Sequence, residues 1–281
     1  MSTVAVLSLS KLIGGVILGY LLLVLLLAGC QRSMIYYPAH GTEEGLTKKA
    51  AAYGLEPWRN AAGDIIGWKT PADSESGNAP SAIIFHGNAG NALHRTYFVS
   101  CFTEQEYWSP WNVYIFEYPG YGARDGRPSE KKIKTAAEEA AASLIEEGGV
   151  ASPVYLVGES LGTGVACYLA GKHSDAVAGL LLITPYTSLV DVGKHHYGWL
   201  PVGLLLRDRF DNREALTEYS GPIAFVVAAD DRVIPAEIGR QIFEAYDGPK
   251  RLWQIGGRGH NTLDYHPDAT WWREVLQFLR K

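Results

Sequence analysis

A serine enclosed by two glycines is the first feature of this sequence that suggests chemistry. The pentapeptide GESLG, residues 158–162, follows the apolar run PVYLV and precedes a stretch that is compatible with a helix. A G-x-S-x-G pentapeptide between a strand and a helix forms a sharp turn that exposes the serine hydroxyl. Because this hydroxyl is a weak nucleophile, it needs a base to remove its proton and an acid to orient the base. Ser160 is therefore a candidate nucleophile that requires a histidine and a carboxylate from elsewhere in the chain.

Candidates for the acid and the base follow two later apolar runs. Asp230 and Asp231 come directly after PIAFVVAA, and His260 lies in the glycine-flanked stretch GRGHN after RLWQI. The order serine, aspartate, histidine along the chain is that of the α/β-hydrolases. His260 is thus the candidate base, and the acid is either Asp230 or Asp231. The other histidines have no suitable strand before them or belong to other elements: His40, His86, His94, His173, His195, His196 and His266.

The stretch HGNAG, which begins at His86, follows the apolar run SAIIF. Acyl transfer passes through a tetrahedral oxyanion, which each preorganised N–H donor stabilises by on the order of 3 kcal/mol. A glycine-rich turn after a strand can supply one donor, and the residue after the nucleophile supplies another. We predict that the N–H groups of Asn88 and Leu161 form this oxyanion hole. A phosphate-binding loop is the alternative, but no Gly-Lys-Ser/Thr follows.

The elements that must position these residues alternate along the chain. Short apolar runs predict strands at residues 81–85, 111–118, 153–158, 178–184, 222–229 and, more weakly, 251–256. Helix-compatible stretches cover residues 91–105, 129–147, 161–172, 236–246 and 269–280. Nearly continuous apolarity is typical of strands buried on both faces, so the sheet should be mostly parallel and doubly wound. Reactive groups collect at the carboxyl ends of such strands, where all the candidates fall.

The composition limits the classes of protein. The chain has 281 residues, 47% of them hydrophobic, and a formal net charge of −5 without a basic stripe, which argues against a nucleic-acid partner. Its three cysteines, Cys30, Cys101 and Cys167, lack the spacing of metal ligands. We therefore expect neither a metal nor a cofactor. No linker or repeat interrupts residues 31–281, which we interpret as one domain.

The first thirty residues form a separate segment. Residues 12–28 carry no charge, and they are long enough for a signal sequence or for a short membrane anchor. The tetrapeptide that ends at Cys30, Leu-Ala-Gly-Cys, resembles the bacterial lipobox, in which the cysteine is acylated after cleavage. An uncleaved anchor, in which Cys30 has no special role, is the alternative. Both interpretations place the protein at a membrane.

Several motifs together resemble a known family. HGNAGN, EYPGYGARDGRPSE, GESLGTGVA, TPYTSLVDVGKHHYGWLP, LLRDRFD and DDRVIP occur in this order, after an apolar segment and the pattern QR-x-x-x-Y-x-P at residues 31–38. The sequence is similar to the membrane-anchored α/β-hydrolases of the yeast bud-emergence homologues and the mammalian acyl-protein depalmitoylases. The resemblance implies an α/β-hydrolase fold and hydrolysis of acyl esters or thioesters. It implies Ser160 as nucleophile, His260 as base and Asp231 as acid, because the family acid precedes x-hydrophobic-hydrophobic-Pro.

A long connection separates the fourth and fifth predicted strands. Residues 186–219 exceed the usual loop length, and we expect them to form a small helical cap. Its apolar part, residues 196–206, either packs on the core or faces an acyl group as a lid. The sequence thus predicts a membrane-tethered serine hydrolase that acts on a small acyl ester or a lipid-like substrate. A serine peptidase of the same fold and a non-catalytic membrane-bound scaffold are the alternatives.

Overall fold

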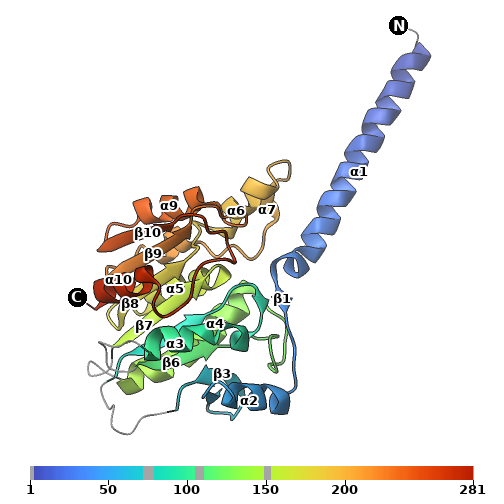
Figure 1. Ribbon diagram of the computed structural model, residues 1–281. Coiled ribbons are helices and arrows are strands. Elements are labelled where there is room, and N and C mark those ends of the chain that lie inside the picture. The colour runs from blue at the N-terminus through green and yellow to red at the C-terminus, as the bar shows by residue number, and fades with distance from the viewer. Residues whose placement is uncertain (1–2, 72–78, 105–110, 149–152, 281) are drawn as a thin grey trace.

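The computed structural model describes residues 3–71, 79–104, 111–148 and 153–280. It begins with a long apolar helix, α1 (Thr3–Ile35), that projects away from the rest of the chain (Figure 1). From Ser10 to Ile35 this helix is long and apolar enough to cross a membrane. It continues without a break through Cys30, so the boundary expected between an anchor of residues 1–30 and the domain lies inside a helix.

An eight-stranded sheet forms the centre of the domain, in the order β10-β9-β8-β7-β4-β6-β3-β2. Each of the six apolar runs in the sequence forms one of its parallel strands. They are β4 (Ser81–Phe85), β6 (Asn112–Phe116), β7 (Val154–Glu159), β8 (Val177–Ile183), β9 (Ile223–Ala228) and β10 (Lys250–Ile255). Every residue of β4 and β9 is buried, because helices cover both faces of the sheet. The prediction of a mostly parallel, doubly wound sheet is confirmed.

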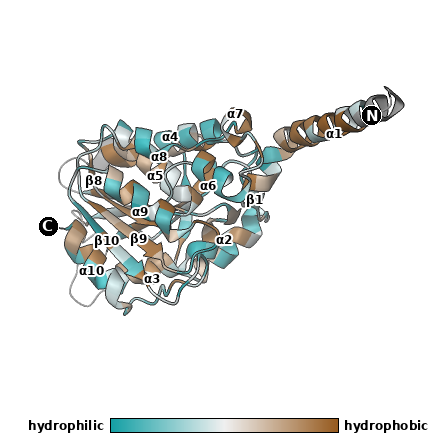
Figure 2. Ribbon diagram, turned by 90° about the horizontal axis from the view of Figure 1, so that it is seen from above, coloured by the Kyte–Doolittle hydropathy of each residue, from teal (hydrophilic) through white to brown (hydrophobic). Residues whose placement is uncertain are grey.

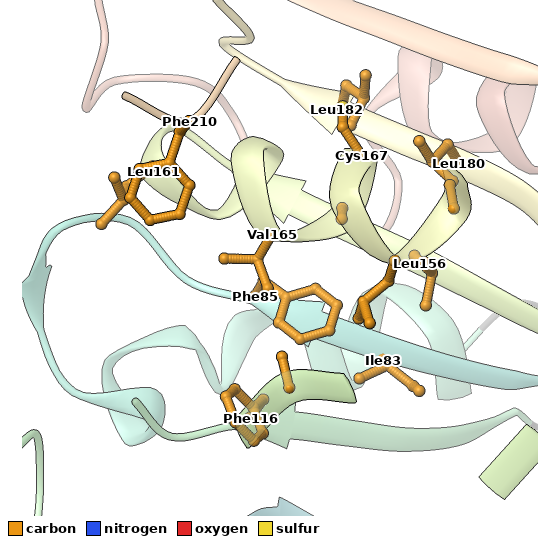
Figure 3. Packing of buried hydrophobic residues seen from close by; sticks show 14 of the residues in the cluster. Ile83, Phe85, Phe116, Leu156, Leu161, Val165, Cys167, Leu180, Leu182 and Phe210 are labelled. Carbon is orange, nitrogen blue, oxygen red and sulfur yellow. The ribbon is translucent and has the colours of Figure 1, made fainter. Parts of the chain in front are cut away.

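Two apolar layers, one on each face of the sheet, form the core. Leu180 and Leu182 of β8 belong to one layer, whereas Leu181 and Ile183 belong to the other, because alternate strand residues point to opposite faces. In Figure 3, which shows the first layer, side chains of α5 face those of β4 and β7. Helices α4 (Glu130–Gly148), α5 (Leu161–Lys172) and α9 (Ala236–Ala245) cover this layer. Helices α2 (Glu43–Ala51), α3 (Tyr97–Thr103) and α10 (Thr270–Leu279) cover the other.

Several elements were not predicted from the sequence. Two antiparallel strands, β2 (Glu56–Arg59) and β3 (Ile65–Lys69), extend the sheet beyond β6. A small two-stranded sheet pairs β1 (Tyr37–Pro38) with β5 (Ala89–Gly90). The helix expected over residues 91–105 is divided into the 3-10 helix η1 (Ala92–Arg95) and α3. The short lengths and the proline in β2 hide these strands from a periodicity argument.

The long connection between β8 and β9 contains three short helices. They are α6 (Leu189–His196), α7 (Val202–Leu205) and α8 (Asn212–Ala215). Ser188 caps α6, since its side chain accepts a hydrogen bond from the N–H of Asp191. Helix α8 packs closely on α5, where the backbone of Gly171 meets that of Ala215. We call residues 189–206, which include α6 and α7, the cap segment; it lies on the side of the domain from which α1 departs (Figure 2).

Candidate active site

Ser160 occupies the sharp turn between β7 and α5. Its backbone φ of 53° and ψ of −118° lie in a region that costs a non-glycine residue on the order of 1–3 kcal/mol. The flanking glycines are required by close packing. A Cβ at Gly162 would lie 1.9 Å from the carbonyl oxygen of Phe85, and one at Gly158 would lie 2.5 Å from Thr163 Cα. The strained turn expected from the G-x-S-x-G pattern is therefore present.

The structure brings Ser160, His260 and Asp231 into one hydrogen-bonded line. The distance from Ser160 Oγ to His260 Nε2 is 2.9 Å, and that from His260 Nδ1 to Asp231 Oδ2 is 2.7 Å. Because a carboxylate only accepts, Nδ1 carries the imidazole hydrogen and Nε2 is free to accept the serine proton. These three side chains come from the ends of three different strands, β7, β9 and β10.

Backbone hydrogen bonds fix the carboxylate of Asp231. Its Oδ1 accepts the N–H groups of Val233 and Ile234, each at 2.8 Å, and its side chain is 1% exposed. Asp230, the alternative acid, is exposed, and its N–H donates to the carbonyl of Arg258 at 2.9 Å. This bond joins the loop after β9 to the loop that carries His260. The geometry thus places Asp231, and not Asp230, beside the imidazole.

The loop after β4 lies over the serine. A Cβ at Gly87 would come 3.6 Å from Ser160 Cβ, and Asn88 and Leu161 line one cavity together with Ser160. Leu161 is the first residue of α5, so its N–H has no acceptor one turn earlier in the helix. The side chain of Asn88 donates to the carbonyl of Ile35 at 2.8 Å, and its own carbonyl accepts the N–H of Tyr37 at 3.0 Å, so this loop is held in place above the serine. Asn88 and Leu161 thus line the same cavity as Ser160, and their role as oxyanion donors stays a prediction.

A partly buried ion pair that the sequence reasoning missed supports this turn. Glu159, the residue before the serine, lies 2.8 Å from Arg95 and accepts the hydroxyl hydrogen of Tyr97 at 3.0 Å. Burial, followed by the carboxylate of Glu159, raises the pKa of Tyr97, so its hydroxyl stays protonated and donates. The pair therefore connects the loop after β4 to the serine turn. In the sequence, the only sign of a role for Glu159 is its place at the first x of the G-x-S-x-G pattern.

A second missed cluster joins the base of α1 to the loop that directly follows the cap segment. Arg32 pairs with Asp208 through two hydrogen bonds of 3.0 and 3.2 Å, and the hydroxyl of Tyr36 donates to the same carboxylate at 3.0 Å. Asp208 is only 3% exposed. These residues belong to the motifs QR-x-x-x-Y-x-P and LLRDRFD, whose spacing in the sequence gives no sign that they meet.

An apolar cavity of about 240 Å³ opens above Ser160. One wall comes from the cap segment, including Val192, Leu200 and Leu205. The other wall comes from the last part of α1, including Leu27 and Ala28. The apolar stretch of residues 196–206 thus faces the cavity, although Trp199 and Leu204 at its outer edge are exposed.

The remaining predicted site residue lies apart from this cavity. Cys30 is exposed on α1, and its thiol donates to the carbonyl of Leu26 at 3.0 Å. Among the residues that the structure describes, no group of three or more histidine, cysteine or acidic side chains is placed to hold a metal ion. The geometry does not bear on acylation of Cys30, which stays a prediction.

Comparisons with known proteins agree with this fold. The family model of the alpha/beta hydrolase fold matches residues 80–215. An uncharacterized protein of Mycobacterium tuberculosis is 31% identical over 253 residues, which cover 89% of this chain and 86% of that protein. The chain belongs to the α/β-hydrolase family.

More distant relatives include proteins of the kind that the sequence motifs resemble. The lysophosphatidylserine lipase ABHD12 of Rattus norvegicus is 28% identical over 204 residues, which cover 66% of this chain and 50% of that protein. Protein bem46 of Schizosaccharomyces pombe is 28% identical over 160 residues, 56% of this chain and 52% of that protein. An esterase of Pyrococcus furiosus has the same fold, with a TM-score of 0.63 and 15% identity over 88% of this chain and 97% of that one.

Proposed function

We propose that this chain is a membrane-tethered serine hydrolase that cleaves acyl esters or thioesters. The observation that carries the proposal is the hydrogen-bonded line from Ser160 through His260 to Asp231. The apolar lining of the cavity above the serine favours an acyl group, and the similarity to a lipase agrees with such a substrate. No cofactor is required by this chemistry.

In the proposed reaction, Ser160 Oγ attacks the carbonyl carbon while His260 Nε2 takes the hydroxyl proton. The N–H groups of Asn88 and Leu161 stabilise the resulting oxyanion. His260 then protonates the leaving alcohol or thiol, and the acyl group remains on Ser160. A water molecule, deprotonated by His260, attacks the acyl-enzyme, and the acid is released as Ser160 regains its proton. Asp231 holds the imidazole in the required tautomer throughout.

A fluorophosphonate probe tests the nucleophile. We expect the wild type to be labelled at Ser160 and Ser160→Ala to be unlabelled, with both proteins equally folded by circular dichroism. Equal labelling of the two proteins would refute the assignment. Comparison of p-nitrophenyl acyl esters with aminoacyl anilides then separates an esterase from a peptidase. A folded wild type that neither reacts with the probe nor turns over any of these compounds would instead be a scaffold.

The mode of membrane attachment needs a separate experiment. We propose that α1 holds the protein in a membrane, either as an uncleaved span or as a signal before an acylated Cys30. Metabolic labelling with an acyl-chain analogue distinguishes the two. Labelling that disappears in Cys30→Ser indicates a lipoprotein, whereas a wild type that is not labelled and keeps residues 1–29 indicates an uncleaved span.

A further inference from the structure

Between residues 24 and 31, one face of α1 is covered, while the other faces are exposed. Val24 and Gln31 are 7% and 8% exposed, whereas Leu25 and Leu26 between them are 67% and 66% exposed. The spacing of Val24, Ala28 and Gln31, at intervals of about one helical turn, puts them on one side of the helix. The helix therefore has a protein-facing side and a side left for lipid.

The covered face is fixed to the cap segment at its base. The side-chain amide of Gln31 uses both ends: Nε2 donates to the carbonyl of Leu205 at 3.2 Å, and Oε1 accepts the N–H of Arg207 at 2.7 Å. Together with the Arg32–Asp208 pair described above, these bonds hold α1 and the cap segment in one orientation. The cavity between them is therefore a built part of the fold.

The outer edge of the cap segment reaches along the apolar part of α1. The hydroxyl of Tyr20 donates to the carbonyl of Trp199 at 3.0 Å, and the two rings lie 6.4 Å apart. At about 1.5 Å per residue, Tyr20 precedes Arg32 by about 18 Å, which is more than half of a hydrocarbon core of about 30 Å. Trp199 is 55% exposed at this level, and Leu204, which adjoins the Leu205 carbonyl bonded by Gln31, is 90% exposed. A bilayer that surrounds α1 therefore also surrounds the outer edge of the cap segment.

We propose that α1 is one wall of the acyl-binding site, and that the acyl chain of a bilayer lipid enters it sideways between α1 and the cap segment. This inference rests on the proposed hydrolase function and on α1 as an uncleaved span, because cleavage before Cys30 would remove Leu27 and Ala28. Leu27, Ala28, Met34 and Ile35 of the helix line the same cavity as Ser160. An acyl chain that passes between α1 and Leu205 stays in apolar surroundings from the bilayer interior to Ser160. Its transfer out of the bilayer therefore exposes little apolar surface to water. These residues of α1 thus select the length and shape of the acyl chain.

A photoreactive probe tests the path of the chain. A long-chain alkyl fluorophosphonate with a diazirine at the end of its chain is incorporated into phosphatidylcholine vesicles that contain the full-length protein. After it reacts with Ser160, illumination should cross-link the chain end to α1 between Tyr20 and Ile35 or to the cap segment, as peptide mass spectrometry would reveal. Labelled Ser160 with cross-links only elsewhere would overturn the lateral path and leave the hydrolase proposal intact. Failure to label Ser160 would overturn both.

A matched pair of substitutions tests the helix as a wall. Ala28→Trp fills the cavity from α1, whereas Leu25→Trp adds an aromatic ring on the lipid-facing side of the same helix. We expect Ala28→Trp to lower the ratio of kcat/KM for a palmitoyl ester to that for a butyryl ester at least tenfold, and Leu25→Trp to leave this ratio within twofold. Equal ratios in the two variants would overturn the inference. If Ala28→Trp does not fold, Leu27→Ala, which enlarges the cavity, should shift the preferred ester to a longer or bulkier chain; an unchanged preference would count against the wall.

Discussion

Replacement of Asp231 by asparagine tests the hydrogen-bonded line most directly. Asparagine keeps an oxygen for the N–H groups of Val233 and Ile234, but it presents an NH₂ group to His260 Nδ1, now 2.7 Å from a carboxylate oxygen. Nδ1 must then accept a hydrogen bond, so the imidazole hydrogen moves to Nε2. That nitrogen faces Ser160 and can no longer take its proton.

The expected loss is large because the wrong tautomer removes the base. The corresponding substitution in a serine protease with the same three residue types lowers kcat about 10,000-fold, or about 5.4 kcal/mol in activation free energy. We expect a similar loss in kcat for p-nitrophenyl butyrate and in the rate of fluorophosphonate labelling. Stability should change little, because both backbone hydrogen bonds remain. Asp231→Ala, by contrast, leaves two N–H groups without this acceptor and should cost about 1–3 kcal/mol for each in urea unfolding.

Asp230→Asn is the matched control for this experiment. Its side chain is exposed, and we expect its kcat to stay within twofold of the wild type. The reasoning would be refuted if Asp231→Asn kept more than a tenth of the wild-type kcat, or if Asp230→Asn lost as much as Asp231→Asn. Either result would mean that the carboxylate beside His260 does not set its tautomer.

Three further substitutions probe the surroundings of the site. Gly162→Ala places a Cβ 1.9 Å from a backbone oxygen and should lower the free energy of unfolding by about 3 kcal/mol or prevent folding. Gly256→Ala, where a Cβ would have no atom within 4 Å, should be tolerated. Equal thermal unfolding temperatures of the two variants would contradict the packing argument. Glu159→Gln leaves the partly buried charge of Arg95 without its partner and should cost about 2 kcal/mol in chemical unfolding. Arg95→Met in the same chain should restore a large part of this loss, and purely additive losses would show that the two side chains are not coupled. Burial, followed by the carboxylate of Asp208, raises the pKa of Tyr36 well above its usual value near 10, so the folded protein keeps a proton that the unfolded chain releases, and stability falls as the pH rises past that value. Tyr36→Phe should therefore reduce the alkaline slope of unfolding free energy by up to about 1.4 kcal/mol per pH unit, and an unchanged slope would exclude this titration.

The sequence predicts the parallel part of the fold well because each strand there is a short apolar run between turn residues. The antiparallel strands are different: β2 contains a proline and two charged residues, and β3 is interrupted by Gly67. Their positions depend on the pairing of β3 with β6 and of β2 with β3, which no local pattern encodes.

The candidate site, like the fold, was predicted only in part from the sequence. Ser160 and His260 were placed by motif and chain order, whereas the choice of Asp231 over Asp230 required the family resemblance. The geometry supplies the physical reason, since only Asp231 turns inward to accept two backbone N–H groups. The contact between Arg32 and Asp208 could not be predicted, because it joins residues 176 positions apart whose meeting depends on the whole fold.

The pairing of β1 with β5 limits how far the N-terminus can be shortened to obtain a protein for work in aqueous buffer. The carbonyl of Ile35 holds the side chain of Asn88, and the N–H of Tyr37 donates to the Asn88 carbonyl at 3.0 Å. A shortened protein that begins after these residues would lose the hydrogen bonds that orient the loop above the serine. Low turnover by such a protein would then reflect a displaced loop, and would give a false impression of its substrate range. Shortening from the N-terminus must therefore stop before Gln31 to keep this loop in place, and must stop before Leu27 to keep the cavity wall as well.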